Sequence, residues 1–168
     1  MSYPQKKTIA TLAAGILVLG AYIIHAITKY QAGAAAPDDL HFWAVTMLVF
    51  IGIGAAATVV IQVLFHIVLS ISISVKENVQ HGECDDKKLE DTIEAEMVED
   101  EMDKLIELKS MRVSFAIAGV GFVAALVSLV LGWPPAVMLN ILFGAFSIGS
   151  LVEGFTQLYF YRSGIRHG

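Results

Sequence analysis

The residue of this chain that stands out chemically is Glu153, a carboxylate inside the otherwise apolar stretch "LVEGFTQLYF". A charge within the hydrocarbon part of a membrane is costly, so it either satisfies another polar group or performs a function. Glu153 lies nine residues before Arg162, and His66 lies ten residues before Lys76. If these basic residues mark the membrane surface, both side chains sit about 13–15 Å inward along their helices, at a shared depth.

Three more polar residues fall near this depth. Gln62 lies one turn deeper than His66, Gln157 lies one turn shallower than Glu153, and Arg112 is long enough to snorkel towards them. We therefore expect an intramembrane polar cluster of these five residues. It could pass protons or hold a cation, because burial favours a neutral carboxylic acid and a nearby cation favours the charged form. Alternatively, the groups only fix helix packing, or Glu153 meets a polar group of another subunit.

The elements that must position these residues are membrane helices. Hydrophobic residues make up 56% of the chain, above the roughly 45–50% of a soluble domain. A membrane helix needs about 20 mostly apolar residues. Four segments meet this requirement, at about residues 8–28, 42–75, 112–132 and 136–161. The sequence thus predicts an all-α fold in a single domain over residues 1–168: a four-transmembrane-helix bundle made of two antiparallel hairpins. The second segment, about 50 Å long at about 1.5 Å per residue, should tilt or project beyond the bilayer.

The basic residues predict the orientation. With both termini in the cytoplasm, ten of the eleven Lys and Arg residues are cytoplasmic, and only Lys29 lies outside. Lys and Arg accumulate in the cytoplasmic loops of membrane proteins. We therefore expect a multi-pass protein of a cytoplasmic membrane, with the N- and C-termini inside.

A polar segment, residues 76–109, separates the two hairpins and would be cytoplasmic. Thirteen of the sixteen acidic residues lie between Glu77 and Glu107. From about Leu89 the pattern predicts an acidic amphipathic helix that leads into the third span. One face of this helix carries carboxylates at three- and four-residue spacing: Glu96, Asp100, Asp103 and Glu107. We interpret this face as solvated, with a cation site or a partner-binding surface as the alternatives.

His81 and Cys84 have a ligand-like spacing, but a zinc site normally takes four ligands. We therefore predict neither a metal nor a cofactor for this chain. Because Cys84 is the single cysteine, an internal disulfide is excluded.

Small residues four apart suggest close helix packing, either within the chain or between chains. The pairs are Gly52 with Ala56, Ala145 with Gly149, and Ser150 with Gly154.

The second hairpin resembles an uncharacterised family of small four-helix membrane proteins of bacteria and archaea. The resemblance rests on "EDEMDKLIELKSMR" and "EGFTQLYFYRSG" and covers about residues 98–165. Members often carry Asp-Glu-Arg-Asp before the third helix and Tyr-x-Arg-Arg-Gly after the fourth. This chain departs from both patterns at an arginine, which is replaced by Met102 and by Ser163. The resemblance implies a prokaryotic inner-membrane protein and carries over no catalytic residue.

Several function classes can be set aside on sequence grounds. The chain has no nucleophile–base arrangement, phosphate loop or complete metal motif, so we do not expect an enzyme. Its net charge of −5 leaves no basic face for nucleic acid. The favoured hypothesis is a small integral membrane protein that acts in the lipid bilayer through interactions, as a homo-oligomer with a possible cytoplasmic protein partner. The alternative is a minimal proton- or cation-handling transporter or channel that uses Glu153 and His66 and, with so few helices, also requires an oligomer.

Overall fold

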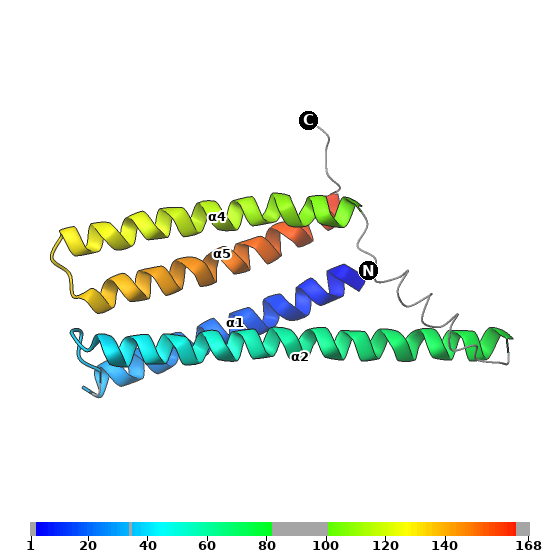
Figure 1. Ribbon diagram of the computed structural model, residues 1–168, viewed down its shortest axis with the longest axis horizontal. Coiled ribbons are helices and arrows are strands. Elements are labelled where there is room, and N and C mark those ends of the chain that lie inside the picture. Colours follow the sequence, from blue (N-terminus) through cyan, green and yellow to red (C-terminus); the bar gives the residue numbers. More distant parts are fainter. Residues whose placement is uncertain (1–2, 34, 82–100, 164–168) are drawn as a thin grey trace.

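The computed structural model describes residues 3–33, 35–81 and 101–163, and no residue of these ranges lies in a strand. The described part contains the helices α1 (Tyr3–Gln31), α2 (Leu40–His81), α4 (Glu101–Val130) and α5 (Pro135–Ser163) (Figure 1). By length and composition, each of the four is able to cross a membrane. The predicted all-α fold with four membrane-spanning helices is therefore confirmed.

The turn between α4 and α5 is encoded by glycine and proline. Gly132 has a φ of 74°, a left-handed conformation that glycine adopts without a steric penalty. The amide of Trp133 donates to the carbonyl of Ser128 at 3.0 Å, which is the helix-ending hydrogen bond of a Schellman motif. Pro135 then begins α5, at a position where its missing N–H costs nothing. The second hairpin is therefore closed by local backbone chemistry.

The turn between α1 and α2 uses similar signals. Gly33 follows the end of α1 with a φ of 67°, and its amide donates to the carbonyl of Tyr30 at 3.1 Å. Asp39 caps α2, because its Oδ1 accepts the amide of Phe42 at 2.9 Å. The buried Trp43 donates from Nε1 to the carbonyl of Ala36 at 3.0 Å, which ties the connection to the helix. Both turns lie at the same end of the molecule (Figure 1).

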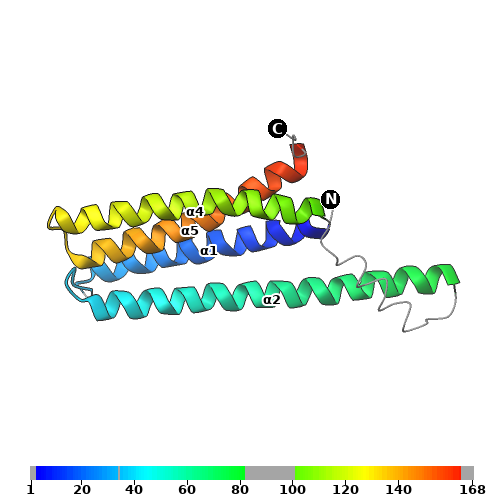
Figure 2. The same cartoon turned by 45° about the horizontal axis from the view of Figure 1, so that its top comes forward.

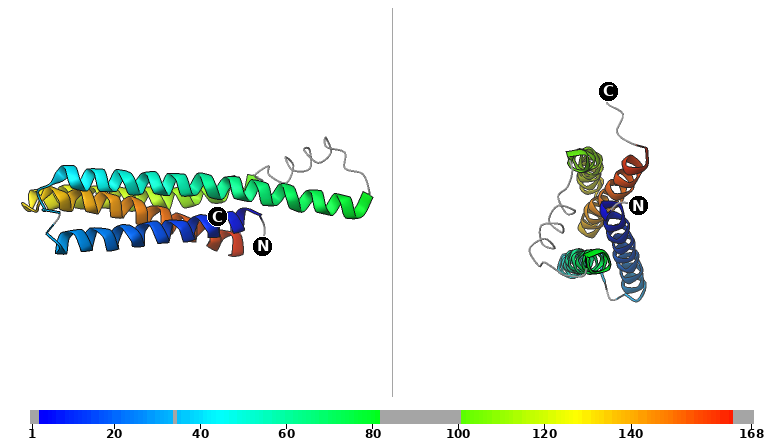
Figure 3. Two further views of the ribbon diagram at one scale, coloured as in Figure 1. Left: turned by 90° about the horizontal axis from the view of Figure 1, so that it is seen from below. Right: turned by 90° about the vertical axis from the view of Figure 1, so that its right-hand side faces the viewer.

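The helices alternate in direction, and α5 is the central one. It packs most closely on α4 and also contacts α1 and α2, whereas α2 packs mainly on α1 (Figures 2 and 3). With 42 residues, α2 is about 60 Å long at about 1.5 Å per residue. Its far end extends past the other three helices (Figure 1). The start of α4, from Glu101, continues without a break into the third span.

Small residues bring α4 and α5 into close contact. A Cβ added at Gly121 of α4 would overlap Ala145 of α5, and one added at Gly149 would lie 3.1 Å from the carbonyl oxygen of Ser114. Ala145 and Gly149 form one of the pairs noted in the sequence. Their lack of bulk lets the two helices approach closely.

The other two pairs have different surroundings. A Cβ added at Gly154 would lie 3.0 Å from Cδ1 of Leu12, so this glycine brings α5 close to α1, while Ser150 lines a cavity. Gly52 and Ala56 are both exposed on α2, and nothing lies within 4 Å of a Cβ added at Gly52. Gly52 and Ala56 therefore do not bring α2 into close contact with another described helix.

Candidate functional site

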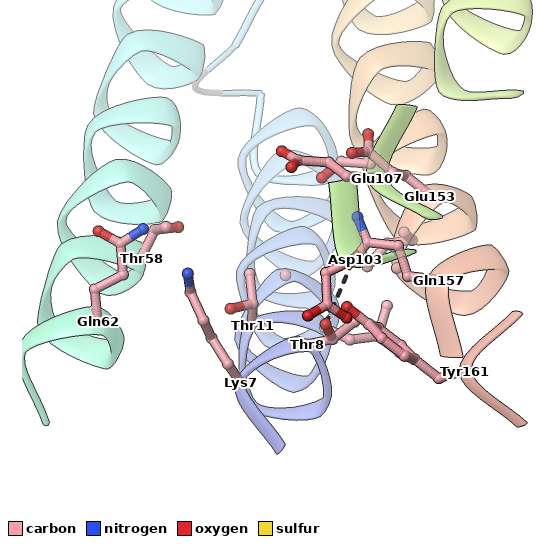
Figure 4. Close-up of a pocket in the computed structure, with 15 residues that line it drawn as sticks. Lys7, Thr8, Thr11, Thr58, Gln62, Asp103, Glu107, Glu153, Gln157 and Tyr161 are labelled. Carbon is pink, nitrogen blue, oxygen red and sulfur yellow. Dashed lines mark hydrogen bonds between the residues drawn. The ribbon is translucent and has the colours of Figure 1, made fainter. Parts of the chain in front are cut away.

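A polar cavity of about 360 Å³ lies towards the end of the bundle that holds the start of α1 and the end of α5 (Figure 4). All four described helices contribute to its wall. Ten side chains with polar groups are labelled in Figure 4: Lys7, Thr8, Thr11, Thr58, Gln62, Asp103, Glu107, Glu153, Gln157 and Tyr161.

The packing of α5 directs Glu153 into this cavity. Gly149 is pressed against α4 and Gly154 against Leu12 of α1, so the rotation of α5 about its axis is set by both neighbours. Glu153 precedes Gly154 and is half-buried between the two contacts. The carboxylate therefore borders the polar cavity.

Two more carboxylates enter the cavity from α4. Ile106 and Ser110 are buried, and the Ser110 hydroxyl donates to the Ile106 carbonyl at 2.7 Å. Asp103 and Glu107, one turn apart, lie on the face of α4 that borders the cavity. Figure 4 draws Glu107 and Glu153 at one level, with Asp103 nearer the start of α1. Two residues of the acidic face predicted from the sequence thus border the same cavity as Glu153, and one of them, Glu107, is exposed.

Among the described residues, Lys7 is the only basic one in the wall of the cavity. Its side chain extends from α1 into the space beside Gln62 and Thr58 of α2 (Figure 4). If all these groups are ionised, three carboxylates face one ammonium group. The cavity then carries an excess of negative charge and attracts cations.

One polar contact at the site is structural. The Thr8 hydroxyl donates to Oε1 of Gln157 at 3.3 Å and joins α1 to α5. Interhelical hydrogen bonds of this kind contribute about 0.6 kcal/mol on average in membrane proteins. Gln157 therefore has a packing role at the edge of the cavity, whatever the cavity binds.

The structure brings together only part of the predicted polar cluster. Glu153, Gln157 and Gln62 line one cavity, although Gln62 itself is largely exposed. Arg112 is exposed on α4 and does not line this space. His66 lies in α2, and its side chain is outside what the structure describes.

The predicted acidic face is also divided. Asp103 and Glu107 line the cavity, whereas Glu96 and Asp100 lie outside the described residues, as does Cys84. Within the described ranges, no group of three His, Cys, Asp or Glu side chains is close enough to hold a metal ion. The three carboxylates are therefore spread along the wall and do not converge on one point.

The residues that α1 contributes to the cavity are not among those predicted from the sequence. Lys7, Thr11 and Gly15 lie on one side of that helix at intervals of four residues, and Thr8 is adjacent to them. Thr58 and Gln62 of α2 have the same spacing. Polar or small residues at this spacing inside apolar spans are the signal that could have identified both faces.

No protein-family model, curated protein or solved structure matches this chain.

Proposed function

We propose that the protein is a minimal transporter or channel that binds a cation or a proton in the cavity lined by Glu153 and moves it across the membrane. The observation that carries the proposal is that Glu153, Glu107 and Asp103, from two helices, line the wall of one polar cavity. Carboxylates that face a common space repel one another when all are charged. A cation held in the cavity offsets this negative charge.

The position of the site in the bundle supports this reading. Glu153 is half-buried within a helix long enough to span a membrane, where an uncompensated charge is costly. Three carboxylates and one Lys side chain, Lys7, line the wall of the same cavity among the described residues.

The proposed setting is the cytoplasmic membrane of a prokaryote, with both termini inside. Ten of the eleven Lys and Arg residues then lie on the cytoplasmic side, as the positive-inside rule requires. The resemblance of residues 98–165 to prokaryotic inner-membrane proteins also supports it. In this orientation the cavity faces the cytoplasm.

A second candidate function is that of an oligomeric interaction protein. The observation in its favour is that Gly52 and Ala56 are exposed on α2, where small side chains would allow a second copy to approach closely. This function is compatible with the first, because a transporter built from so few helices also requires an oligomer. Residues 76–109 would be the segment that contacts a cytoplasmic partner.

A flux assay in proteoliposomes tests the main proposal. The wild-type chain should dissipate an imposed proton or monovalent-cation gradient, and Glu153→Gln, which keeps the shape and removes the charge, should reduce the flux to that of empty liposomes. Glu101→Gln is the matched control, since Glu101 is exposed on α4 and does not line the cavity. Absence of flux in the wild type under every gradient, or equal flux in Glu153→Gln, would refute the proposal.

A further inference from the structure

A second, apolar groove continues from the polar cavity. It has a volume of about 510 Å³ and lies between α1, α2 and α5. The two spaces share five wall residues, Thr11, Gly15, Thr58, Ser150 and Leu151. Together they form one elongated site with carboxylates at one end and hydrocarbon at the other.

The far end of the groove is aromatic, because Phe50 and Phe143 line it. Phe146, which is largely exposed, also lines the groove, one turn nearer to the shared residue Ser150. Tyr22 packs on Phe143 with ring centroids 4.2 Å apart and on Phe50 at 5.3 Å. The Tyr22 hydroxyl donates to Oδ1 of Asn140 at 2.7 Å, so the ring that supports this wall is itself held. Aromatic walls of this kind suit a rigid apolar body.

We infer that the natural ligand of this site is a lipophilic organic cation, whose charged group lies among Glu153, Glu107 and Asp103 and whose apolar body lies in the groove. This inference rests on the proposed function and narrows it to a class of substrate. Charge complementarity selects the sign of the ligand, because three carboxylates and one Lys line the polar end. An inorganic cation would leave the apolar groove unused, and an anionic amphiphile would be repelled.

The orientation of the site fits entry from the inner leaflet. In the proposed topology, the carboxylates lie towards the cytoplasmic surface and the groove leads towards the middle of the bilayer. An amphiphilic cation in the inner leaflet already has this orientation, with its charge at the interface and its apolar part inward. It can therefore enter between helices without turning over.

The test is a binding measurement on the full chain in lipid nanodiscs with three probes. Tetraphenylphosphonium has both charge and apolar body, tetraphenylborate has the same shape and the opposite charge, and tetramethylammonium has the charge alone. We expect saturable binding of tetraphenylphosphonium, with the other two binding at least tenfold more weakly, since about 1.4 kcal/mol separates such affinities. Glu153→Gln should weaken tetraphenylphosphonium binding by a similar factor, whereas Glu101→Gln should not.

Neighbouring alanines of α2 provide a matched pair for the groove. Ala57 lines the groove, whereas Ala55 is exposed and lines neither space. Ala57→Phe should displace the probe, and Ala55→Phe should leave its affinity unchanged. Phe146→Ala should also weaken probe binding, because it removes part of the apolar wall of the groove. The Phe146 side chain is 64% exposed, so its truncation should leave folding intact.

The outcomes separate this inference from the proposed function. Equal binding of tetraphenylborate, equal binding of tetramethylammonium, or equal effects of Ala57→Phe and Ala55→Phe would each overturn the inference. Glu153-dependent flux without saturable tetraphenylphosphonium binding would refute the ligand class and leave the proposed function standing. Absence of both flux and tetraphenylphosphonium binding in the wild type would refute the proposed function and the ligand class.

Discussion

At the scale of single residues, the surroundings of Glu153 explain why a membrane helix can contain it. The side chain borders a polar cavity with Gln157, Glu107 and Lys7, and the neighbouring Gly154 lets α1 approach closely enough to form one wall. Counting residues along the sequence gives the depth of Glu153 in the membrane. It does not give the face of α5 on which the side chain lies. It is the packing of small residues that places this carboxylate in the cavity.

Gly121 offers a test of that packing, with Gly119 as its control. Gly121→Ala should destabilise the protein, since its methyl group would overlap Ala145 and overpacking typically costs about 1–3 kcal/mol. Gly119→Ala, at an exposed site with nothing within 4 Å of the added Cβ, should stabilise by about 0.5–1 kcal/mol, because alanine favours helix over glycine. Unfolding in mixed micelles measures both changes. A neutral or stabilising Gly121→Ala would contradict the observed contact between α4 and α5.

At the scale of elements, hydropathy predicts the helices but not the faces they turn to one another. The four spans follow from the lengths of the apolar segments, and the structure contains all four. The angle of each helix about its axis depends on small steric contacts, such as Gly149 with Ser114, that a single sequence does not specify. For this reason Glu107 borders the same cavity as Glu153, whereas Arg112, expected near the site, is exposed.

The exposed face of α2 that includes Gly52 is predicted to contact a second copy of the chain. In a Cys84→Ser background, Gly52→Cys should form a disulfide-linked dimer in native membranes under mild oxidation, because Gly52 and Ala56 are the small residues on its outer side. Gly54→Cys is the control, since a Cβ at this position faces Val18 of α1 at 3.9 Å. Cross-linking that is absent from Gly52→Cys, or equal at the two positions, would count against an oligomer formed through this face.

At the scale of the whole molecule, polarity changes along the bundle. One end holds the start of α1, the end of α5, Lys7 and the three carboxylates of the cavity, and the interior beyond them becomes apolar and then aromatic. α5 connects these regions, because it packs on all three other helices and contributes to both spaces. The account therefore depends on one property: the polar end of the site must be open to water while the outer faces of the same helices contact lipid.

Thiol labelling across α1 measures that property most directly. In a Cys84→Ser background, Thr11→Cys lies where the two spaces meet, and Ala13→Cys lies at nearly the same depth on the exposed face. A cationic, membrane-impermeant methanethiosulfonate reagent is applied from the cytoplasmic side. It should modify Thr11→Cys many times faster than Ala13→Cys. After correction for intrinsic reactivity, it should also modify Thr11→Cys faster than an anionic reagent of the same kind does. Equally slow modification of the two cysteines would show that water does not reach the cavity and that its polar groups only fix helix packing. That result would contradict the proposed cation-binding site.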